Sequence, residues 1–284
     1  MKIQNFYDKD TATFTYVVSD ESSKKCAVVD SVMGYDIFSG RTSYAPADIV
    51  VDYIKSQNLN VEWILETHAH ADHLSAAHYL QEKLGGKIAI GENIKEVIKF
   101  WTSVFNTAKD TPLNGSQFDH LFKDGEKFMI GNLEVTVMHT PGHTPACACY
   151  VVQDCIFVGD TIFAPAMGTA RTDFPGGSAE NLYDSIQKIL SLPNETKIFV
   201  GHDYPQEGKE PQFLCTVAEQ KKNNILVNEK ISKAEYVATR NKRDVGKAVP
   251  KLLLPSIQVN IRAGRFGDAE DNGVNYIKIP LNKI

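Results

Sequence analysis

The sequence Thr67-His68-Ala69-His70-Ala71-Asp72-His73 places three imidazoles and one carboxylate within six residues. Residues 61–65, just before it, form a short apolar run of strand-forming side chains, which predicts a buried strand. Residues 74–84, just after it, have the apolar spacing of a helix that ends at Gly85-Gly86. The cluster is therefore predicted to lie on a loop between a strand and a helix, a common place for binding groups. Imidazole and carboxylate together suit zinc, iron or manganese better than calcium, which makes incidental histidines at a polar helix start the weaker interpretation.

Three later strand-like segments also end in side chains that bind metals. His143 lies in a Pro-Gly turn after one strand, Asp160 follows a second strand and His202 follows a third. Strands that end at one rim of a sheet system bring such side chains together, so the sequence predicts a metal site there. The residues of this predicted cluster are His68, His70, Asp72, His73, His143, Asp160 and His202. The histidines that we expect to be structural or solvated are His78, His120 and His139.

The whole chain has an ordinary globular composition, with 284 residues, 43% hydrophobic and 23% charged residues and a formal charge of −5. This length allows one large domain or two small ones. No repeat or clear linker interrupts the sequence, so we predict a single domain over residues 1–284, with residues 211–284 as a helical and extended C-terminal extension packed on it. The acidic balance, and the lack of a basic run or of an apolar run near ~20 residues, indicate neither nucleic acid nor membrane as a partner.

Five cysteines are present, an odd number, and their spacing matches no zinc knuckle. Three of them, Cys147, Cys149 and Cys155, lie in apolar strand-like sequence, where cysteine is commonly a small core residue. Reduced thiols indicate a reducing compartment, and we expect the protein to be cytoplasmic. The strand-like sequence that begins by Thr13 is expected to leave no room for a leader peptide.

The remaining segments predict a series of short elements. Residues 34–44 look like a loop, and Pro46 is expected to begin a helix. The inward face of this helix is expected to carry Ile49, Val50, Tyr53 and Ile54. Residues 211–229 and 232–241 are predicted to be helices. The chain is predicted to be extended from residue 249 onward.

Four motifs, THAHADH, TPGHT, GDT and GHDY in chain order, resemble those of the metallo-β-lactamase superfamily. More narrowly, the chain resembles the persulfide dioxygenases of the ethylmalonic encephalopathy protein 1 group, and above all its bacterial β-lactamase-like hydrolase branch. The segments that carry the narrower resemblance include Arg171-Thr172-Asp173-Phe174, His202-Asp203-Tyr204 and Leu254-Pro255-Ser256-Ile257-Gln258-Val259-Asn260. The resemblance implies an α/β fold, an αβ/βα sandwich of two mixed β-sheets flanked by helices, with the metal at one edge.

The resemblance further implies that the protein binds one Fe(II) and converts glutathione persulfide and O2 to sulfite and glutathione. His68, His143 and Asp160 would be the iron ligands, a set that leaves about three coordination positions open. The residues that would either orient these ligands or form a second metal site are His70, Asp72, His73 and His202. Arg171 and Tyr204 match positions that contact substrate, and the fork of an arginine suits a glutathione carboxylate. A separate sulfurtransferase would be a partner, and a homodimer or a larger assembly is expected.

The same ligand set leaves other interpretations open. A dinuclear zinc thioesterase of the glyoxalase II type would use all seven residues, with a water between two zinc ions as the nucleophile. A flavodiiron oxygen reductase is disfavoured because that group has a carboxylate at the position of His70. Nuclease relatives are disfavoured by the acidic charge, and a non-enzymatic persulfide sensor by the intact ligand set. Arg171 could instead form a structural salt bridge with Asp173, and the basic residues 240–243 fit a solvated helix end or an anionic-substrate site.

Overall fold

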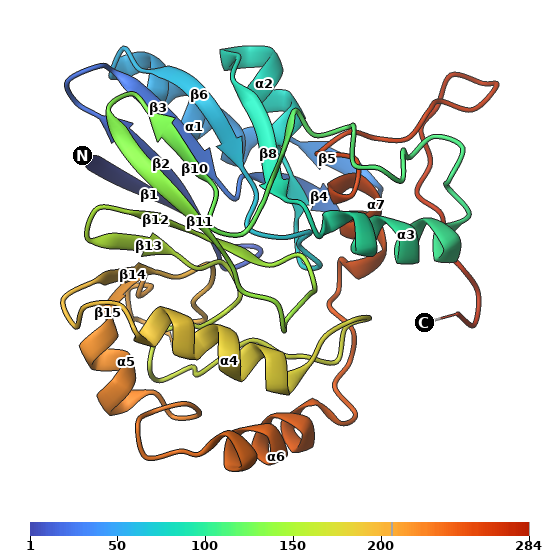
Figure 1. Ribbon diagram of the computed structural model, residues 1–284. Helices are drawn as coiled ribbons and strands as arrows, with labels where there is room; N and C mark the ends of the chain where they lie inside the picture. Colours follow the sequence, from blue (N-terminus) through green and yellow to red (C-terminus); the bar gives the residue numbers. More distant parts are fainter. Residues whose placement is uncertain (206, 284) are drawn as a thin grey trace.

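Two mixed β-sheets form the centre of the computed structural model, which describes residues 1–205 and 207–283 (Figure 1). The first sheet has the strand order β1-β2-β3-β6-β8-β9. Its strands are β1 Lys2–Asp8, β2 Thr13–Asp20, β3 Lys25–Val29, β6 Asn60–Leu65, β8 Lys87–Gly91 and β9 His120–Phe122. From β3 to β9 the neighbouring strands are parallel. Asp30 after β3 and the histidine loop after β6 therefore leave the sheet at the same edge.

The second sheet delivers the other predicted ligands to its own edge. Its order is β10-β11-β12-β13-β14-β15, and only β13 and β14 are a parallel pair. Its strands are β10 Lys127–Ile130, β11 Leu133–His139, β12 Ala148–Val152, β13 Cys155–Phe157, β14 Lys197–Phe199 and β15 Leu214–Thr216. Because β11 and β13 both run antiparallel to β12, they point the same way as β14. The turns that carry His143, Asp160 and His202 thus follow three strands that share a direction.

Helices cover the outer faces of the two sheets. The helices packed against the first sheet are α1 Ala45–Ser56, α2 Ala77–Leu84, α3 Ile94–Phe105 and α7 Leu253–Asn260. The helices on the side of the second sheet are α4 Ala179–Leu190, α5 Val217–Asn223 and α6 Lys233–Asp244 (Figure 1). A small third sheet has the order β5-β4-β7, formed by β4 Val32–Asp36, β5 Arg41–Ser43 and β7 Leu74–Ser75. The expected αβ/βα sandwich of two mixed sheets flanked by helices is confirmed.

The alternating side chains of the central strands build two hydrophobic cores. On β2, Phe14, Tyr16 and Val18 face the core between the sheets, where side chains of β12 and β13 meet them. Val17 points the other way and packs in the core beneath α1, α2, α3 and α7. This two-residue period follows from the pleat of a strand that is covered on both faces. Across residues 1–205 and 207–283, no helix combines the length and hydropathy that a membrane span requires.

Several predicted elements differ in the structure. The segment predicted to be extended from residue 249 contains α7, which is buried on nearly every side and so has no apolar stripe in its sequence. Pro255 fits because it lies in the first turn, where its missing N–H has no partner within the helix. Residues 34–44 contain β4 and β5 instead of a loop, and β5 is exposed throughout, so no alternation marks it.

Two helix predictions need smaller corrections. On α1, Ile49 is 60% exposed, and the residues that the helix buries are Ala47, Val50, Val51 and Ile54. Only residues 217–223 of the predicted helix at 211–229 are helical, as α5, and β15 precedes them. The helix predicted at 232–241 is confirmed as α6, which begins with a capping box between Ser232 and Glu235.

Candidate metal centre

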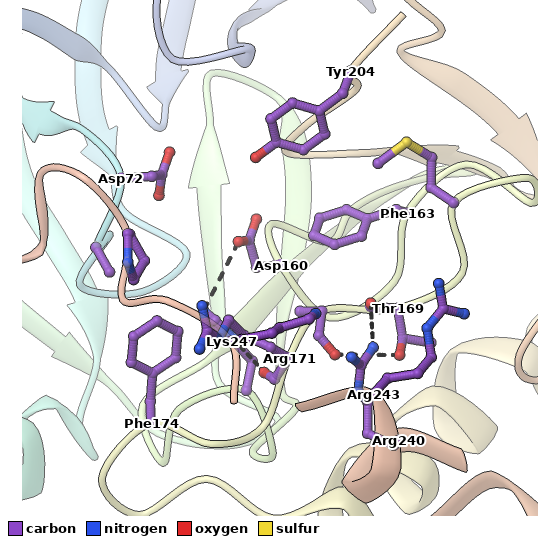
Figure 2. Close-up of a pocket in the computed structure, with 15 residues that line it drawn as sticks. Asp72, Asp160, Phe163, Thr169, Arg171, Phe174, Tyr204, Arg240, Arg243 and Lys247 are labelled. Carbon is purple, nitrogen blue, oxygen red and sulfur yellow. Dashed lines mark hydrogen bonds and ion pairs between the residues drawn. The ribbon is translucent and has the colours of Figure 1, made fainter. Parts of the chain in front are cut away.

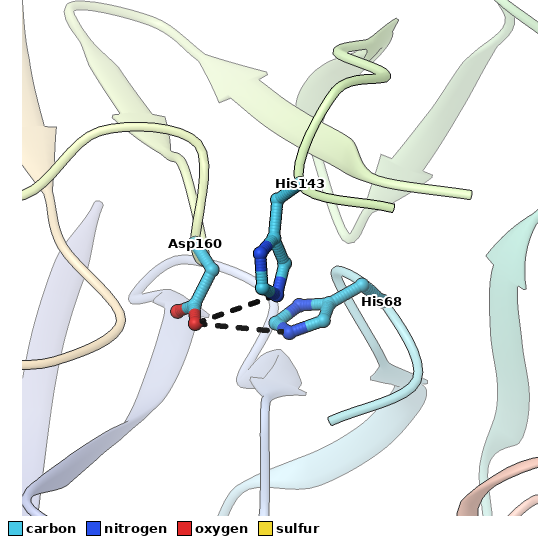
Figure 3. Close-up of side chains that lie close together, drawn as sticks. All are labelled: His68, His143 and Asp160. Carbon is cyan, nitrogen blue, oxygen red and sulfur yellow. Dashed lines mark ion pairs between the residues drawn. The ribbon is translucent and has the colours of Figure 1, made fainter. Parts of the chain in front are cut away.

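Three of the predicted ligands meet at the edge where the two sheets come together (Figure 3). Nε2 of His68 lies 3.9 Å from Oδ2 of Asp160, and Nε2 of His143 lies 3.8 Å from the same oxygen. One ligand atom from each residue lies within 4.8 Å of the others. The loop after β6, the turn after β11 and the loop after β13 supply them, so residues distant in sequence converge as predicted.

Hydrogen bonds fix which ring nitrogen each histidine presents to this centre. The Thr67 hydroxyl donates to Oδ2 of Asp30 at 2.8 Å, so its oxygen must accept the Nδ1–H of His68 at 3.0 Å. The carbonyl oxygen of Arg171 lies 2.8 Å from Nδ1 of His143 and can only accept, so that nitrogen also carries the proton. Both imidazoles therefore direct the lone pair of Nε2 toward Asp160, as metal ligation requires.

The protonation of the trio fits a bound cation. Nε2 of His68 is buried and has no hydrogen-bond partner in the part of the chain that the structure describes. Burial, reinforced by the neighbouring imidazoles, holds the pKa of His68 well below its ordinary value, so the ring is neutral and free to ligate. Burial raises the pKa of Asp160 despite the opposing charges of His202 and His143. A cation at the centre would favour the carboxylate form of Asp160 and would give both this carboxylate and Nε2 of His68 a partner.

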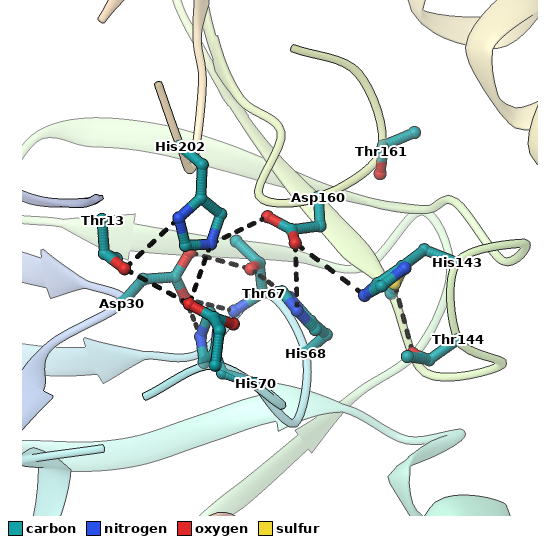
Figure 4. A network of polar contacts seen from close by, with 12 residues as sticks. Thr13, Asp30, Thr67, His68, His70, His143, Thr144, Asp160, Thr161 and His202 are labelled. Atoms are coloured by element: carbon teal, nitrogen blue, oxygen red, sulfur yellow. Dashed lines mark hydrogen bonds and ion pairs between the residues drawn. The ribbon is translucent and has the colours of Figure 1, made fainter. Parts of the chain in front are cut away.

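A second group of ligand types lies beside the first (Figure 4). It consists of His70, Asp72 and His202, with one ligand atom each within 4.8 Å of the others. Nε2 of His202 lies 3.3 Å from Oδ2 of Asp72 and 3.3 Å from Oδ1 of Asp160. His73 is outside this group, although its ring centroid lies 4.2 Å from that of His70, with the planes tilted by 34°, and its buried Nε2 has no hydrogen-bond partner among the described residues.

Two buried carboxylates, those of Asp30 and Glu66, contact Nε2 of His70. Its Nε2 lies 3.0 Å from Oδ1 of Asp30 and 3.1 Å from Oε2 of Glu66, and Ser75 donates to the other oxygen of Glu66 at 2.5 Å. Burial alone would lower the pKa of His70, but these two acids outweigh it and raise that pKa well above its ordinary value. Nδ1 of the same ring is buried and has no hydrogen-bond partner among the described residues, so it is the nitrogen left to ligate a metal.

The side chain of Asn260 on α7 fixes the backbone of the histidine loop. Its Oδ1 accepts the N–H of Ser75 at 2.7 Å, and its Nδ2 donates to the carbonyls of His70 and His73, each at 2.8 Å. All of these groups are buried. The late segment of the chain thus supports the loop that carries four of the predicted ligand residues.

A cavity of about 380 Å³ opens above the trio (Figure 2). Its apolar lining includes Phe163, Met167 and Phe174, and its inner end reaches His143 and Asp160. The volume lies within the roughly 300–1,000 Å³ that small-molecule sites occupy. A compact substrate can therefore approach the centre from this side.

Both predicted substrate contacts line the cavity. Tyr204 stacks its ring on that of His202, with centroids 6.0 Å apart. Arg171 is committed to the protein, because Nε and Nη2 each contact an oxygen of Asp173 at 2.6 Å and Nη1 donates to the carbonyl of Ala248 at 2.8 Å. The alternative salt bridge with Asp173 is therefore present, and the guanidinium faces the pocket with its fork already occupied.

The remaining histidines lie away from the centre. His139 is on β11 and points to the carbonyl of Phe122 at 3.0 Å. His120, expected in a loop, lies on β9 with Nε2 2.6 Å from Glu126. His78 is on α2, 3.5 Å from Glu82.

Three residues of the centre escaped the sequence argument, namely Asp30, Glu66 and Asn260. Asp30 follows the apolar strand β3, the same signal that identified Asp160, and Glu66 directly precedes the histidine motif. Both signals were available. Asn260 ends a segment that carries the narrower resemblance, but the polarity of one asparagine does not reveal which distant loop it meets.

Comparisons with known proteins agree with this geometry. The sequence model of the metallo-beta-lactamase superfamily matches residues 8–202. The chain is 51% identical to a Dictyostelium discoideum protein named Glyoxylase B2, over all of this chain and 98% of that protein. It is 28% identical to the human mitochondrial persulfide dioxygenase ETHE1, over 92% of this chain and 88% of that protein. The crystal structure of ETHE1 from Myxococcus xanthus matches with a TM-score of 0.75 and 25% identity, over 93% of this chain and 100% of that chain. The chain belongs to the metallo-beta-lactamase superfamily.

Proposed function

We propose that the protein is an iron-dependent persulfide dioxygenase. In the proposed reaction, glutathione persulfide, O2 and water give glutathione and sulfite. The terminal sulfur is oxidised and loses its bond to the glutathione sulfur, O2 is reduced, and two of the three sulfite oxygens come from O2 when water supplies the third. The persulfide would arrive as such or from a separate sulfurtransferase.

The open trio of His68, His143 and Asp160 is the observation that carries the proposal. Two imidazoles and one carboxylate are a ligand set typical of non-haem Fe(II) oxygenases, and they leave about three positions free. When bound, ferrous iron would supply the redox chemistry that O2 requires. We propose a single metal, with the second group empty: Asp30 and Glu66 raise the pKa of His70, so a second ion at Nδ1 would have to compete with a proton there.

The other side chains of the pocket would bind and orient the substrate. Phe163 and Phe174 give it apolar walls beside Asp160 and His143, which limits the water that reaches the reacting sulfur. The carbonyl of Arg171 keeps the proton on Nδ1 of His143, while the side chain of the same residue braces the loop through Asp173. Tyr204 closes the opposite side.

A dinuclear zinc hydrolase of the glyoxalase II type is the second candidate. The group of His70, Asp72 and His202 beside the first centre favours it, because Asp160 has one oxygen toward each group. The name of the Dictyostelium relative points the same way. In this case His70 would have to lose its proton and ligate through Nδ1.

Elemental analysis of anaerobically purified protein and an oxygen-electrode assay with glutathione persulfide separate the two candidates. We expect a single iron per chain and oxygen consumption that depends on the persulfide. His68→Ala should abolish both and keep the fold, whereas the control His78→Ala, on α2 away from the centre, should keep both. Two zinc ions per chain, thioester hydrolysis without oxygen uptake, or retained oxygen uptake in His68→Ala would contradict the proposal.

A further inference from the structure

The helix α6 and the turn after it contribute a cationic wall to the cavity. Four cationic side chains line the cavity, namely Arg171, Arg240, Arg243 and Lys247. Arg240 and Arg243 lie one turn apart on the same face of α6, and Lys247 lies in the turn after the helix. Figure 2 places Arg240 and Arg243 on the side of the cavity away from Asp72 and Tyr204.

Two of these cations are already neutralised by the protein. Arg171 is paired with Asp173, as described above. Arg240 is buried, and Asp244 accepts from its Nε at 3.0 Å and also from its Nη2. The same Asp244 accepts the N–H of Thr172 at 2.9 Å, which fastens the end of α6 to the loop beside the trio.

Arg243 is exposed and differs from both because no partner engages it in the part of the chain that the structure describes. Among residues 1–205 and 207–283, no carboxylate lies within 4.0 Å of its guanidinium and no hydrogen bond engages it. Lys247 has only a loose contact of 3.5 Å with Asp244, which Arg240 already occupies. Burial and the positive charge of Arg240 lower the pKa of Lys247, which an anion in the pocket would reverse.

The charges of this wall do not cancel. The four cations face two carboxylates, those of Asp173 and Asp244, so two positive charges remain. The metal end of the cavity, in contrast, carries Asp72 and Asp160. The cationic end therefore attracts an anionic group such as a free carboxylate, which leaves the metal end for the reacting sulfur of the proposed substrate.

We propose that Arg243, assisted by Lys247, binds a carboxylate of the glutathione portion of the substrate and so selects small acidic peptide thiols. This inference rests on the proposed function for its choice of glutathione. It assigns the carboxylate contact to the end of α6 rather than to Arg171, whose fork is occupied. An unpaired guanidinium can meet a carboxylate with two parallel hydrogen bonds.

Binding of S-methylglutathione, which cannot react, tests the inference in the metal-loaded full chain. We expect Arg243→Gln to raise the dissociation constant roughly tenfold, or about 1.4 kcal/mol, because a charge-assisted hydrogen bond is lost. Lys242→Gln removes the same charge one residue away on α6, outside the lining of the pocket, and should change it less than twofold. The diethyl ester of S-methylglutathione has no carboxylates, and Arg243→Gln should leave its binding unchanged.

The outcomes distinguish this subsite from the proposed function. Equal losses for the acid and the ester, or no loss for the acid, would overturn the subsite. If wild-type protein binds as expected but consumes no oxygen with glutathione persulfide, the subsite stands and the dioxygenase fails. If oxygen is consumed, Arg243→Gln should raise KM for the persulfide with little change in kcat, and an unchanged KM would overturn the subsite alone.

Discussion

Thr67 acts on the centre through a single hydroxyl proton. That proton is donated to Asp30, which leaves the oxygen to accept from His68 and forces the lone pair of the ring onto Nε2. The backbone N–H of Thr67 also donates to Asp30 at 2.7 Å, so the residue is held at two points. The orientation of a ligand is thus determined by a side chain that never touches the metal.

Thr67→Val should weaken metal binding by about 10–100-fold, because it keeps the shape of the side chain but leaves the Nδ1–H of His68 without an acceptor. Titration of metal-free protein with a competing chelator measures the affinity. Thr67→Ser keeps the hydroxyl and serves as the control, with an affinity close to that of the wild type. Equal affinities in all three proteins would show that Thr67 does not orient His68.

At the scale of elements, α7 and the histidine loop form one unit. The helix is buried almost throughout and directs Asn260 at three backbone groups of the loop. The strand β6 and the loop after it could be predicted because apolar residues and Gly85-Gly86 bound the motif. The helix α7 could not, because a segment buried on all sides has no period, and tertiary packing rather than local preference determines its conformation.

Asn260→Ala should lower the free energy of unfolding by about 1–3 kcal/mol, since it leaves buried backbone groups without partners. Urea unfolding measures this loss, and faster removal of the metal by a chelator should accompany it. Asn241→Ala on the exposed face of α6 provides a matched control that should be near neutral. A wild-type rate of metal release in Asn260→Ala would mean that the histidine loop keeps its conformation without the Asn260 side chain.

At the scale of the whole molecule, strand direction determines the site. All seven predicted ligands follow strands whose carboxyl ends reach one rim, and six of them fall in the two groups, which is why the motifs sufficed to predict the cluster. The sequence could not reveal which cations remain free for substrate. Arg171 has a partner two residues away, whereas the neutralisation of Arg240 and the freedom of Arg243 follow from the docking of α6 on the loop at residue 172.

The five cysteines predict a loss of stability at alkaline pH. All five thiols are free and buried, and burial raises the pKa of Cys147 to about 12 and that of Cys149 to about 11. In the unfolded chain these thiols ionise near pH ~8.5, so above that value the unfolded state binds fewer protons than the folded state. Stability should therefore fall as the pH rises from about 8.5 toward 11.

Calorimetry of metal-free protein between about pH 8 and about pH 10.5 would check this expectation. Tm should fall across this interval, which spans the ordinary thiol pKa. Cys149→Ala should make the decline of Tm with rising pH less steep, because it removes one of the five thiols. Iodoacetamide at pH 8 should modify the native protein little and the unfolded protein fully. Rapid labelling of the native chain would contradict the burial on which the expectation rests.

The contact between Asn260 and the histidine loop also has a consequence for biosynthesis. A ribosome makes the loop at residues 67–73 almost two hundred positions before it makes the asparagine that anchors it. Until that asparagine emerges, the nascent chain lacks the support that aligns its imidazoles. Metal capture should therefore be a late event in the life of each new molecule, after translation has passed α7.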